Sequence, residues 1–333
     1  MTKIQQFIFL LVFSFSLAGK AQDIHFSQYS FTPSLLSPAL SQNFNSEFRG
    51  GAVYRNQWAS VPVNYTTFLG YFDKKIHTSW AGNSLAYGMH FQFDQAGDAG
   101  LSWMQLQFNG VISRPISPMV TMALGVGLGY GSRQFKPEKL SFGHQFTDQY
   151  RPNLPSGENF TQTSAGFSDF SIGLHTHVQN HQLYKADMGV SWSHLNHPKI
   201  SFLGEDISLL PSIQIYGLGQ VSLSEKTDVL ANAVYRLQNP YSEWVISSGL
   251  KYYLNKETNQ NLAVSILAGM RWGDAFFPEF HVYYKNWNGG LSYDINHSDF
   301  KVATAGKGGV EFSIQYIANQ IVPPKKTKIC PIF

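Results

Sequence analysis

Two histidines and a set of opposite charges are the residues of this sequence whose types and spacing could do chemistry. His175 and His177 stand two positions apart in the stretch GLHTHVQ. On an extended segment they share a face, and two imidazoles on one face can begin a metal site. Because spacing specifies no further ligand, we interpret the pair as polar residues on the inner side of a sheet, and we expect no metal and no cofactor.

Nucleophilic catalysis would require a serine or an acid activated by histidine, and the chain has 11 histidines and many serines. No nucleophile signature such as G-x-S-x-G stands out, however. The glycines of GVGLGYG keep the spacing of a strand and precede no helix, so they do not predict a phosphate-binding loop. The sequence therefore disfavours an enzyme. A membrane enzyme stays as a third hypothesis, which loss of activity on changing one inward histidine or serine would support.

Charged residues on distant segments indicate a structural role instead. Asp294 and Glu311 fall on the polar side of two late segments, where Arg55, Arg236 or Lys251 could neutralise them. A buried charge is costly unless it is paired. We therefore expect paired charges that keep the interior rigid.

The elements that must position these residues are strands. After Gln22, apolar and polar residues alternate with a period of two, and long helical periodicity is hard to find. In GGLSYDINHS (289–298), for example, leucine, tyrosine and isoleucine alternate with serine, aspartate and asparagine. About fourteen strands are predicted, near residues 48–58, 65–75, 84–95, 100–113, 119–134, 166–179, 183–195, 210–224, 226–238, 242–255, 260–273, 276–286, 287–297 and 308–319.

The polar side of these strands separates two all-β architectures. A soluble sandwich needs its charged faces in water, whereas a transmembrane barrel accepts polar lumen residues on nearly every strand and turns its apolar residues to lipid. Charged residues make up only 14% of the chain, where a soluble domain has about 25%. We therefore predict an antiparallel up-and-down β-barrel of about 14 strands, surrounded by outer-membrane lipid, with a plug-like N-terminal segment.

Other features refine the predicted barrel. Glycines at every second position from Gly125 to Gly131 indicate a bend, or another segment packed closely against that wall. Long links at 135–165, 196–209 and 298–307 fall at one end, as outer loops do, and short links fall at the periplasmic end, except the medium-length IHTSWAGN. Seven tryptophans near strand ends are interpreted as interfacial girdles: Trp58, Trp80, Trp103, Trp192, Trp244, Trp272 and Trp287.

The start of the chain is typical of a secretory signal peptide. Lys3 precedes a short apolar run, and Gly19 and Ala21 fit a cleavage site before Gln22. The predicted domains are the signal peptide at 1–21, an N-terminal periplasmic or lumenal segment at 22–46, the barrel at 47–319 and a periplasmic tail at 320–333. The formal net charge of the whole chain is only +3, so a nucleic-acid partner is not expected.

Two segments outside the strands carry their own signals. Residues 22–46 are rich in aromatics, include Pro33 and Pro38 and show no alternation, so we expect them to pack inside the lumen or across the periplasmic mouth, with a short helix near 34–40. The single cysteine, Cys330, lies in the tail and cannot form an internal disulfide. It is interpreted as a free thiol, or as a docking or redox contact.

Six stretches resemble the PorP/SprF family of outer-membrane proteins of the type IX secretion system of Bacteroidota. They are FSQYSFTPSLLSPAL (26–40), YRNQWASVPVNYTTF (54–68), WSHLNHP (192–198), GLSYDINHS (290–298), GGVEFSIQY (308–316) and the terminal CPIF. Among the family-motif residues are Tyr54, Arg55, Gln57, Trp58, Tyr293, Asp294 and Asn296.

The resemblance implies a non-enzymatic barrel that exports or attaches secreted cargo bearing a type IX C-terminal signal domain, such as a gliding adhesin. It also implies periplasmic partners that reach the peptidoglycan and the motor. On this basis we expect a surface anchor whose outer loop grips cargo through Phe142, Phe146, Tyr150 and Arg151, residue types that favour binding. The tail would meet the periplasmic partner through Lys325, Lys326, Lys328, Cys330 and Phe333. The alternative is an outer-membrane channel or porter for small solutes, gated by residues 22–46.

Overall fold

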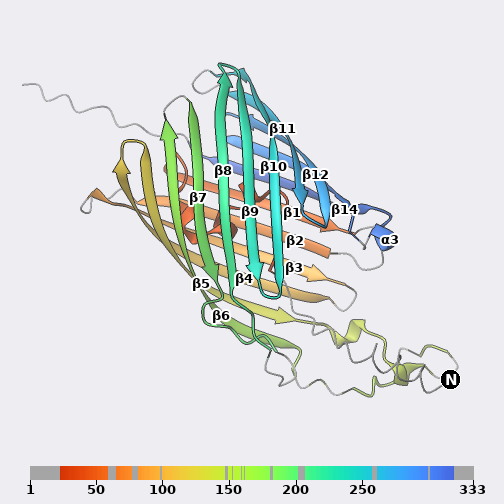
Figure 1. Ribbon diagram of the computed structural model, residues 1–333. Helices are drawn as coiled ribbons and strands as arrows, with labels where there is room; N and C mark the ends of the chain where they lie inside the picture. The colour runs from red at the N-terminus through yellow and green to blue at the C-terminus, as the bar shows by residue number, and fades with distance from the viewer. Residues whose placement is uncertain are drawn as a thin grey trace, which may run out of the picture.

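The alternating segments form a closed barrel (Figure 1). The computed structural model describes residues 23–58, 65–76, 82–97, 100–146, 149–151, 153–158, 160, 162–180, 183–201, 207–256, 261–298 and 301–318. Each strand pairs antiparallel with its neighbours in the sequence, and β1 also pairs with β14, so the sheet has no open edge. In these parts of the chain no helix is long and apolar enough to cross a membrane.

Fourteen strands build the wall, which confirms the predicted fold class. They are β1 (Phe48–Gln57), β2 (Tyr65–Ile76), β3 (Ser84–Ala96), β4 (Leu101–Ser117), β5 (Val120–Gln134), β6 (Ser164–Asn180), β7 (Tyr184–Ser193), β8 (Ser212–Ser224), β9 (Thr227–Gln238), β10 (Tyr241–Asn255), β11 (Leu262–Arg271), β12 (Ala275–Tyr284), β13 (Trp287–Asn296) and β14 (Lys307–Ile317). The short helical pieces are η1 (Tyr29–Phe31), α2 (Pro33–Leu36), η2 (Pro38–Gln42), η4 (Pro137–Lys139), η5 (Gly143–Gln145) and α3 (Lys301–Thr304).

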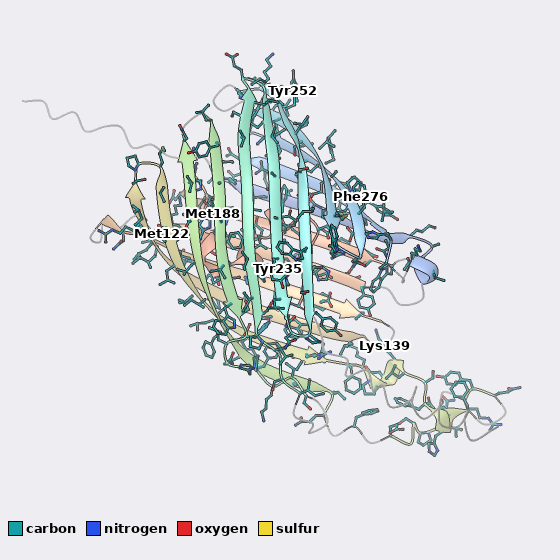
Figure 2. The ribbon with its side chains drawn as sticks, in the orientation of Figure 1. Met122, Lys139, Met188, Tyr235, Tyr252 and Phe276 are labelled. Atoms are coloured by element: carbon teal, nitrogen blue, oxygen red, sulfur yellow. The ribbon has the colours of Figure 1, made fainter. Side chains whose placement is uncertain are left out.

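The two faces of β13 show why alternation produces a barrel here. Tyr293 is 42% exposed on the outside, whereas its neighbour Asp294 is 1% exposed on the inside. A strand has a side-chain period of two, so the same division holds along its length. In Figure 2, Met122, Met188 and Phe276 likewise point away from the barrel. Apolar side chains therefore cover the outer surface, which places the barrel in a membrane, and a soluble sandwich is ruled out.

The tryptophan girdle is confirmed only in part. Trp192, Trp244, Trp272 and Trp287 are all exposed on the outside of the barrel. Trp103 was wrongly assigned, because it packs inward against Phe167 with ring centroids 4.8 Å apart. Trp103 lies two residues before Gln105 on β4, so both side chains face the lumen, where the large indole fills space. Trp80 lies outside the described residues.

The N-terminal segment fills the lumen as a plug. We call residues 23–46, which include η1, α2 and η2, the plug; its apolar residues pack against lumen-facing residues of the wall, including Tyr29 against Val245 and Phe277. The predicted short helix near 34–40 corresponds to α2 and η2. The plug accounts for the first glycine of the β5 run, because a Cβ on Gly125 would lie 2.3 Å from the backbone nitrogen of Ala39, whereas at Gly127, Gly129 and Gly131 a Cβ would meet side chains of the wall. The wall is thus bare where the plug approaches closest, as the second interpretation of the glycines predicts.

Candidate functional site: the plugged lumen and the outer loop

The plug runs through the barrel from one mouth to the other. Asp23 contacts Gln238, at the end of β9 beside the β9–β10 turn, and Ser46 donates a hydrogen bond to the carbonyl of Ala318, beyond the end of β14. The turn after β9 lies at the same end of the barrel as the long link 135–163, at the bottom of Figure 1. We call this end the loop end. The plug therefore contacts the barrel at both mouths.

A buried carboxylate anchors the first part of the plug to the wall. Glu311 of β14 is fully buried and accepts backbone hydrogen bonds from Ser27 (2.7 Å) and Gln28 (3.0 Å). The Gln28 side-chain amide also donates to the Glu311 carbonyl at 3.0 Å. The wall gives space for this, since a Cβ on Gly290 would lie 2.2 Å from Oε1 of Gln28. One acid thus satisfies two backbone donors of a segment that has no sheet partners.

Arg55 neutralises this carboxylate and a second one. Its guanidinium lies 3.2 Å from Glu311 and 2.5 Å from Asp294, and it also donates to the carbonyl of His25 at 2.8 Å. Asp294 in turn accepts a hydrogen bond from the Ser27 hydroxyl at 2.7 Å. The predicted pairing of Arg55 with the two late acids is therefore confirmed, and the plug is part of it.

The network continues around the wall through Arg271 and Glu243, which the sequence did not single out. Arg271 lies 3.3 Å from Asp294 and 3.1 Å from Glu243, and it donates to the Ser27 hydroxyl at 2.8 Å. Arg236 joins it by pairing with Glu243 at 2.6 Å. Lys251 does not: its ammonium lies 3.7 Å from the centre of the Tyr283 ring, because β10 places it toward the opposite mouth. Alternation predicts which side these residues face but cannot predict their partners.

A second contact, which we call the latch, holds the start of the plug at the loop end. His194, just after β7, lies between two carboxylates, with Nε2 2.9 Å from Asp23 and Nδ1 2.9 Å from Asp169. Burial alone would lower the pKa of His194, but the charges and hydrogen bonds of Asp23 and Asp169 outweigh it and raise the pKa to about 10. Burial would raise the pKa of Asp23, yet His194 and its hydrogen bonds lower it. The latch is therefore an ion pair at neutral pH.

The histidine pair of β6 is a structural contact as well. His177 Nδ1 lies 2.6 Å from Asp187 of β7, and His175 Nε2 lies 3.4 Å from the same carboxylate oxygen. The described residues hold no group of three or more histidine, cysteine, aspartate or glutamate side chains placed to bind a metal ion. Both imidazoles thus contact the same wall carboxylate, as polar residues on the inner side of a sheet can.

The four predicted cargo residues lie on the long link between β5 and β6. Phe146 and Tyr150 form an isolated bridge, with ring centroids 5.1 Å apart, and both are exposed. Arg151 is exposed beside them and donates its backbone N–H to the Gln145 carbonyl at 2.9 Å. Phe142 is only half-buried and packs against Phe160 at 5.7 Å. The structure therefore brings three of the four to one exposed surface and uses the fourth as internal packing.

Gln145 gives this loop its shape. Its side chain is buried, accepts a hydrogen bond from the Phe142 backbone at 2.9 Å and donates one to the Leu154 carbonyl at 3.0 Å. The side chain thus joins the start of the loop to its far side. Its only sequence signal is a glutamine three residues after a helix N-cap, the second half of a capping box, and we did not single it out.

The sequence model of the family described as type IX secretion system membrane protein PorP/SprF matches residues 18–316. The chain belongs to the PorP/SprF family. None of the curated proteins matches the chain. Membership in this family, together with the barrel, places the protein in the outer membrane as a component of type IX secretion.

Solved structures share the fold of this PorP/SprF protein. The toluene transporter TbuX of Ralstonia pickettii is 10% identical, has a TM-score of 0.52 and covers 91% of this chain and 96% of its own. A deletion mutant of the monoaromatic hydrocarbon channel TodX is 9% identical, has a TM-score of 0.51 and covers 86% of this chain and 93% of its own. The monoaromatic hydrocarbon channel CymD is 9% identical, has a TM-score of 0.50 and covers 91% of this chain and 95% of its own. At such identities the likeness extends to the fold alone.

The PorP/SprF motif residues divide by face. Arg55, Asp294 and Asn296 face the lumen, and the first two bind the plug. Tyr54 and Tyr293 are exposed on the outside, about 40% each. Gln57 lines a cavity with Trp58, whose ring contacts Tyr65 at 4.7 Å. The predicted tail residues Lys325, Lys326, Lys328, Cys330 and Phe333 lie outside the described residues, as does the predicted signal peptide.

Proposed function

We propose that this protein is a non-enzymatic surface anchor of the type IX secretion system. It is exported by its signal peptide, binds secreted cargo that bears a type IX C-terminal signal domain, such as a gliding adhesin, and couples this cargo to periplasmic machinery. The loop end faces the cell exterior, and the tail at 320–333 faces the periplasm. This division of the chain follows the domains inferred from the sequence.

The filled lumen is the observation that carries the proposal. The plug is held by Glu311, Asp294 and Arg55 on the wall strands and by His194 at the loop end. Removing one partner of a buried ion pair leaves an uncompensated charge, at a cost of about 3–5 kcal/mol. A plug held this way favours a rigid carrier of other proteins over an open pore.

The cargo surface is the exposed part of the long loop. Phe146, Tyr150 and Arg151 combine two aromatic rings with a guanidinium on a surface shaped by Gln145. Tyrosine and arginine are enriched among residues that dominate binding energies. The loop stands clear of the barrel (Figure 1), so a folded domain can reach it.

The decisive test is purification of the tagged protein from its native outer membrane in mild detergent, with mass spectrometry of what is retained. A secreted protein ending in a type IX signal domain supports the anchor. Replacement of Phe146, Tyr150 and Arg151 by alanine should release that cargo. Replacement of Trp272, which is 72% exposed in the short β11–β12 link at the same end, is the matched control and should not.

A channel or porter for small solutes is the second candidate, favoured by the cavity that remains between the plug and the wall. In that case the plug would act as a gate. The intact protein would come alone from the membrane and would conduct ions in a planar bilayer. A conductance that appears only after deletion of residues 22–46 would show that the plug closes the lumen.

A further inference from the structure

One side of the plug does not fill the lumen completely. A cavity of about 110 Å³ lies between the plug residues Leu35 and Pro38 and the wall strands β3 to β8. It extends from Gln107, deep in the barrel, to Arg133 near the loop end of β5. A water molecule needs only about 10–15 Å³ of such space, so the cavity has room for a compact molecule.

Polar atoms without protein partners gather on its walls. Among the described residues, six cavity-lining side chains have a buried nitrogen or oxygen with no hydrogen-bond partner: Ser34 Oγ, His90 Nδ1, Gln92 Oε1, Ser102 Oγ, Trp103 Nε1 and Gln214 Oε1. His90, Gln92 and Gln214 are all more than nine-tenths buried. Leaving such an atom unsatisfied costs about 1–3 kcal/mol, so several around one cavity point to a partner inside it.

The neighbours of the two glutamines fix their orientation. Gln105 must turn its amide nitrogen to the Asp169 carboxylate, at 3.0 Å, because a carboxylate only accepts. Its oxygen therefore accepts from the Gln92 amide at 2.8 Å, and the Gln92 oxygen is left facing the cavity. The Gln214 amide similarly donates to the Leu35 carbonyl at 3.3 Å, which leaves its oxygen free. The cavity thus offers two fixed acceptors and one fixed donor, the Trp103 indole, beside the hydroxyls of Ser34 and Ser102, which can donate or accept.

The charged side chains around the cavity disfavour a negatively charged ligand, and their own pairing means that a positively charged ligand is not needed. Three carboxylates line it, against the cations His194 and Arg133. Each carboxylate already has protein donors: Asp23 and Asp169 share His194, and Asp94 accepts from the Thr67 hydroxyl at 2.6 Å. His194 thus neutralises two of the three carboxylates, and the third has a hydroxyl donor.

We propose that this cavity binds a compact neutral polyol, of monosaccharide size or smaller. Its hydroxyl groups donate to the oxygens of Gln92 and Gln214 and accept from the indole of Trp103. Its C–H groups lie against Leu35 and Pro38, the apolar part of the lining. The site is independent of cargo binding, because no residue of the long loop 135–163 lines it.

The test is titration calorimetry on the full-length protein in detergent with glycerol, myo-inositol and glucose as probes. Glucosamine and glucuronate test the same ring with a positive or a negative charge. Saturable binding of a neutral probe, weakened about three- to tenfold by Trp103→Phe or Gln214→Met, supports the site, since each change removes one hydrogen bond to the ligand. Gln214→Met also removes the bond to the Leu35 carbonyl, which Trp103→Phe leaves in place. Trp244→Phe on the outer face is the matched control and should leave binding unchanged.

Three results would overturn the proposal. If no neutral probe binds at millimolar concentration, the polar atoms are satisfied by water alone. If only the charged sugars bind, the ligand class is wrong. If a neutral probe binds equally well to Trp103→Phe and Gln214→Met, it binds elsewhere. Neither variant touches the latch or Arg55, and a thermal melt of each checks that the barrel is intact.

Discussion

Arg55 and Asp294 lie 2.5 Å apart inside the barrel, on strands β1 and β13 that are separated by 239 positions in the sequence. Between them runs β14, whose Glu311 faces Arg55 directly in the strand register. The plug residue Ser27 bonds to both acids, so three wall strands and the plug meet at this arginine.

Replacing Arg55 by methionine should destabilise the folded barrel by about 3–5 kcal/mol, because two buried carboxylates lose a cation. Thermal unfolding in detergent, followed by circular dichroism, measures the loss. Arg114→Met is the control, since Arg114 is exposed at the end of β4 and should change stability by about 0.5 kcal/mol or less. Equal melting temperatures for the two variants would mean that Arg55 does not hold the interior together.

Gly125→Val should displace the plug, because its Cβ would overlap the backbone of Ala39. Overpacking of this kind costs about 1–3 kcal/mol. Faster proteolysis of residues 23–46 in the intact barrel measures the displacement. Gly217→Ala, where an added Cβ meets nothing within 4 Å, is the control. A plug that stays protected in Gly125→Val would contradict the close packing described above.

The latch should make stability fall as the pH rises. His194 has a raised pKa of about 10, against 6.5 when unfolded, so its contribution is fully present below pH 6.5 and is lost as the pH approaches 10. Asp23 has a lowered pKa, so its contribution is present above pH 3.8 and is lost in acid. Melting temperatures of the protein and of His194→Gln across this range isolate the histidine. The difference between the two should shrink toward pH 10, and a constant difference would exclude a charged latch.

Gln145→Ala should abolish cargo retention without removing any proposed contact residue. The loop loses the side chain that joins Phe142 to Leu154, so Phe146, Tyr150 and Arg151 no longer share a surface. The melting temperature should stay constant, because the loop lies outside the barrel. Ser156→Ala, at an exposed position of the same loop, is the control. Full retention of cargo by Gln145→Ala would show that loop shape is unimportant.

The sequence predicts the wall better than the interior. A period of two identifies β13 and places Asp294 inside, because side-chain direction is a local property of a strand. The glycines of β5 also predict, from the sequence alone, that another segment packs against this strand, and Ala39 of the plug does so at Gly125. Trp103 was assigned to the wrong face because its residue type outweighed its position in β4.

Pairing inside the lumen is not local, and this limits prediction of the site. Asp23 and His194 are 171 positions apart and meet only because the plug begins at the loop end. Arg271 and Glu243 have the inward parity of many other polar residues, and nothing in the sequence marks them. Gln145 acts through a loop turn that strand periodicity does not describe.

The seam between β1 and β14 has a consequence for assembly. It brings together the first and last strands to be made, and it is also where Glu311 and Arg55 meet the plug. A barrel that closed without its plug would trap Glu311 and Asp294 with fewer donors, at a cost that weakens the seam. The last strand therefore pairs most stably with β1 when the plug is already in the lumen, so closure of the barrel depends on correct placement of the plug.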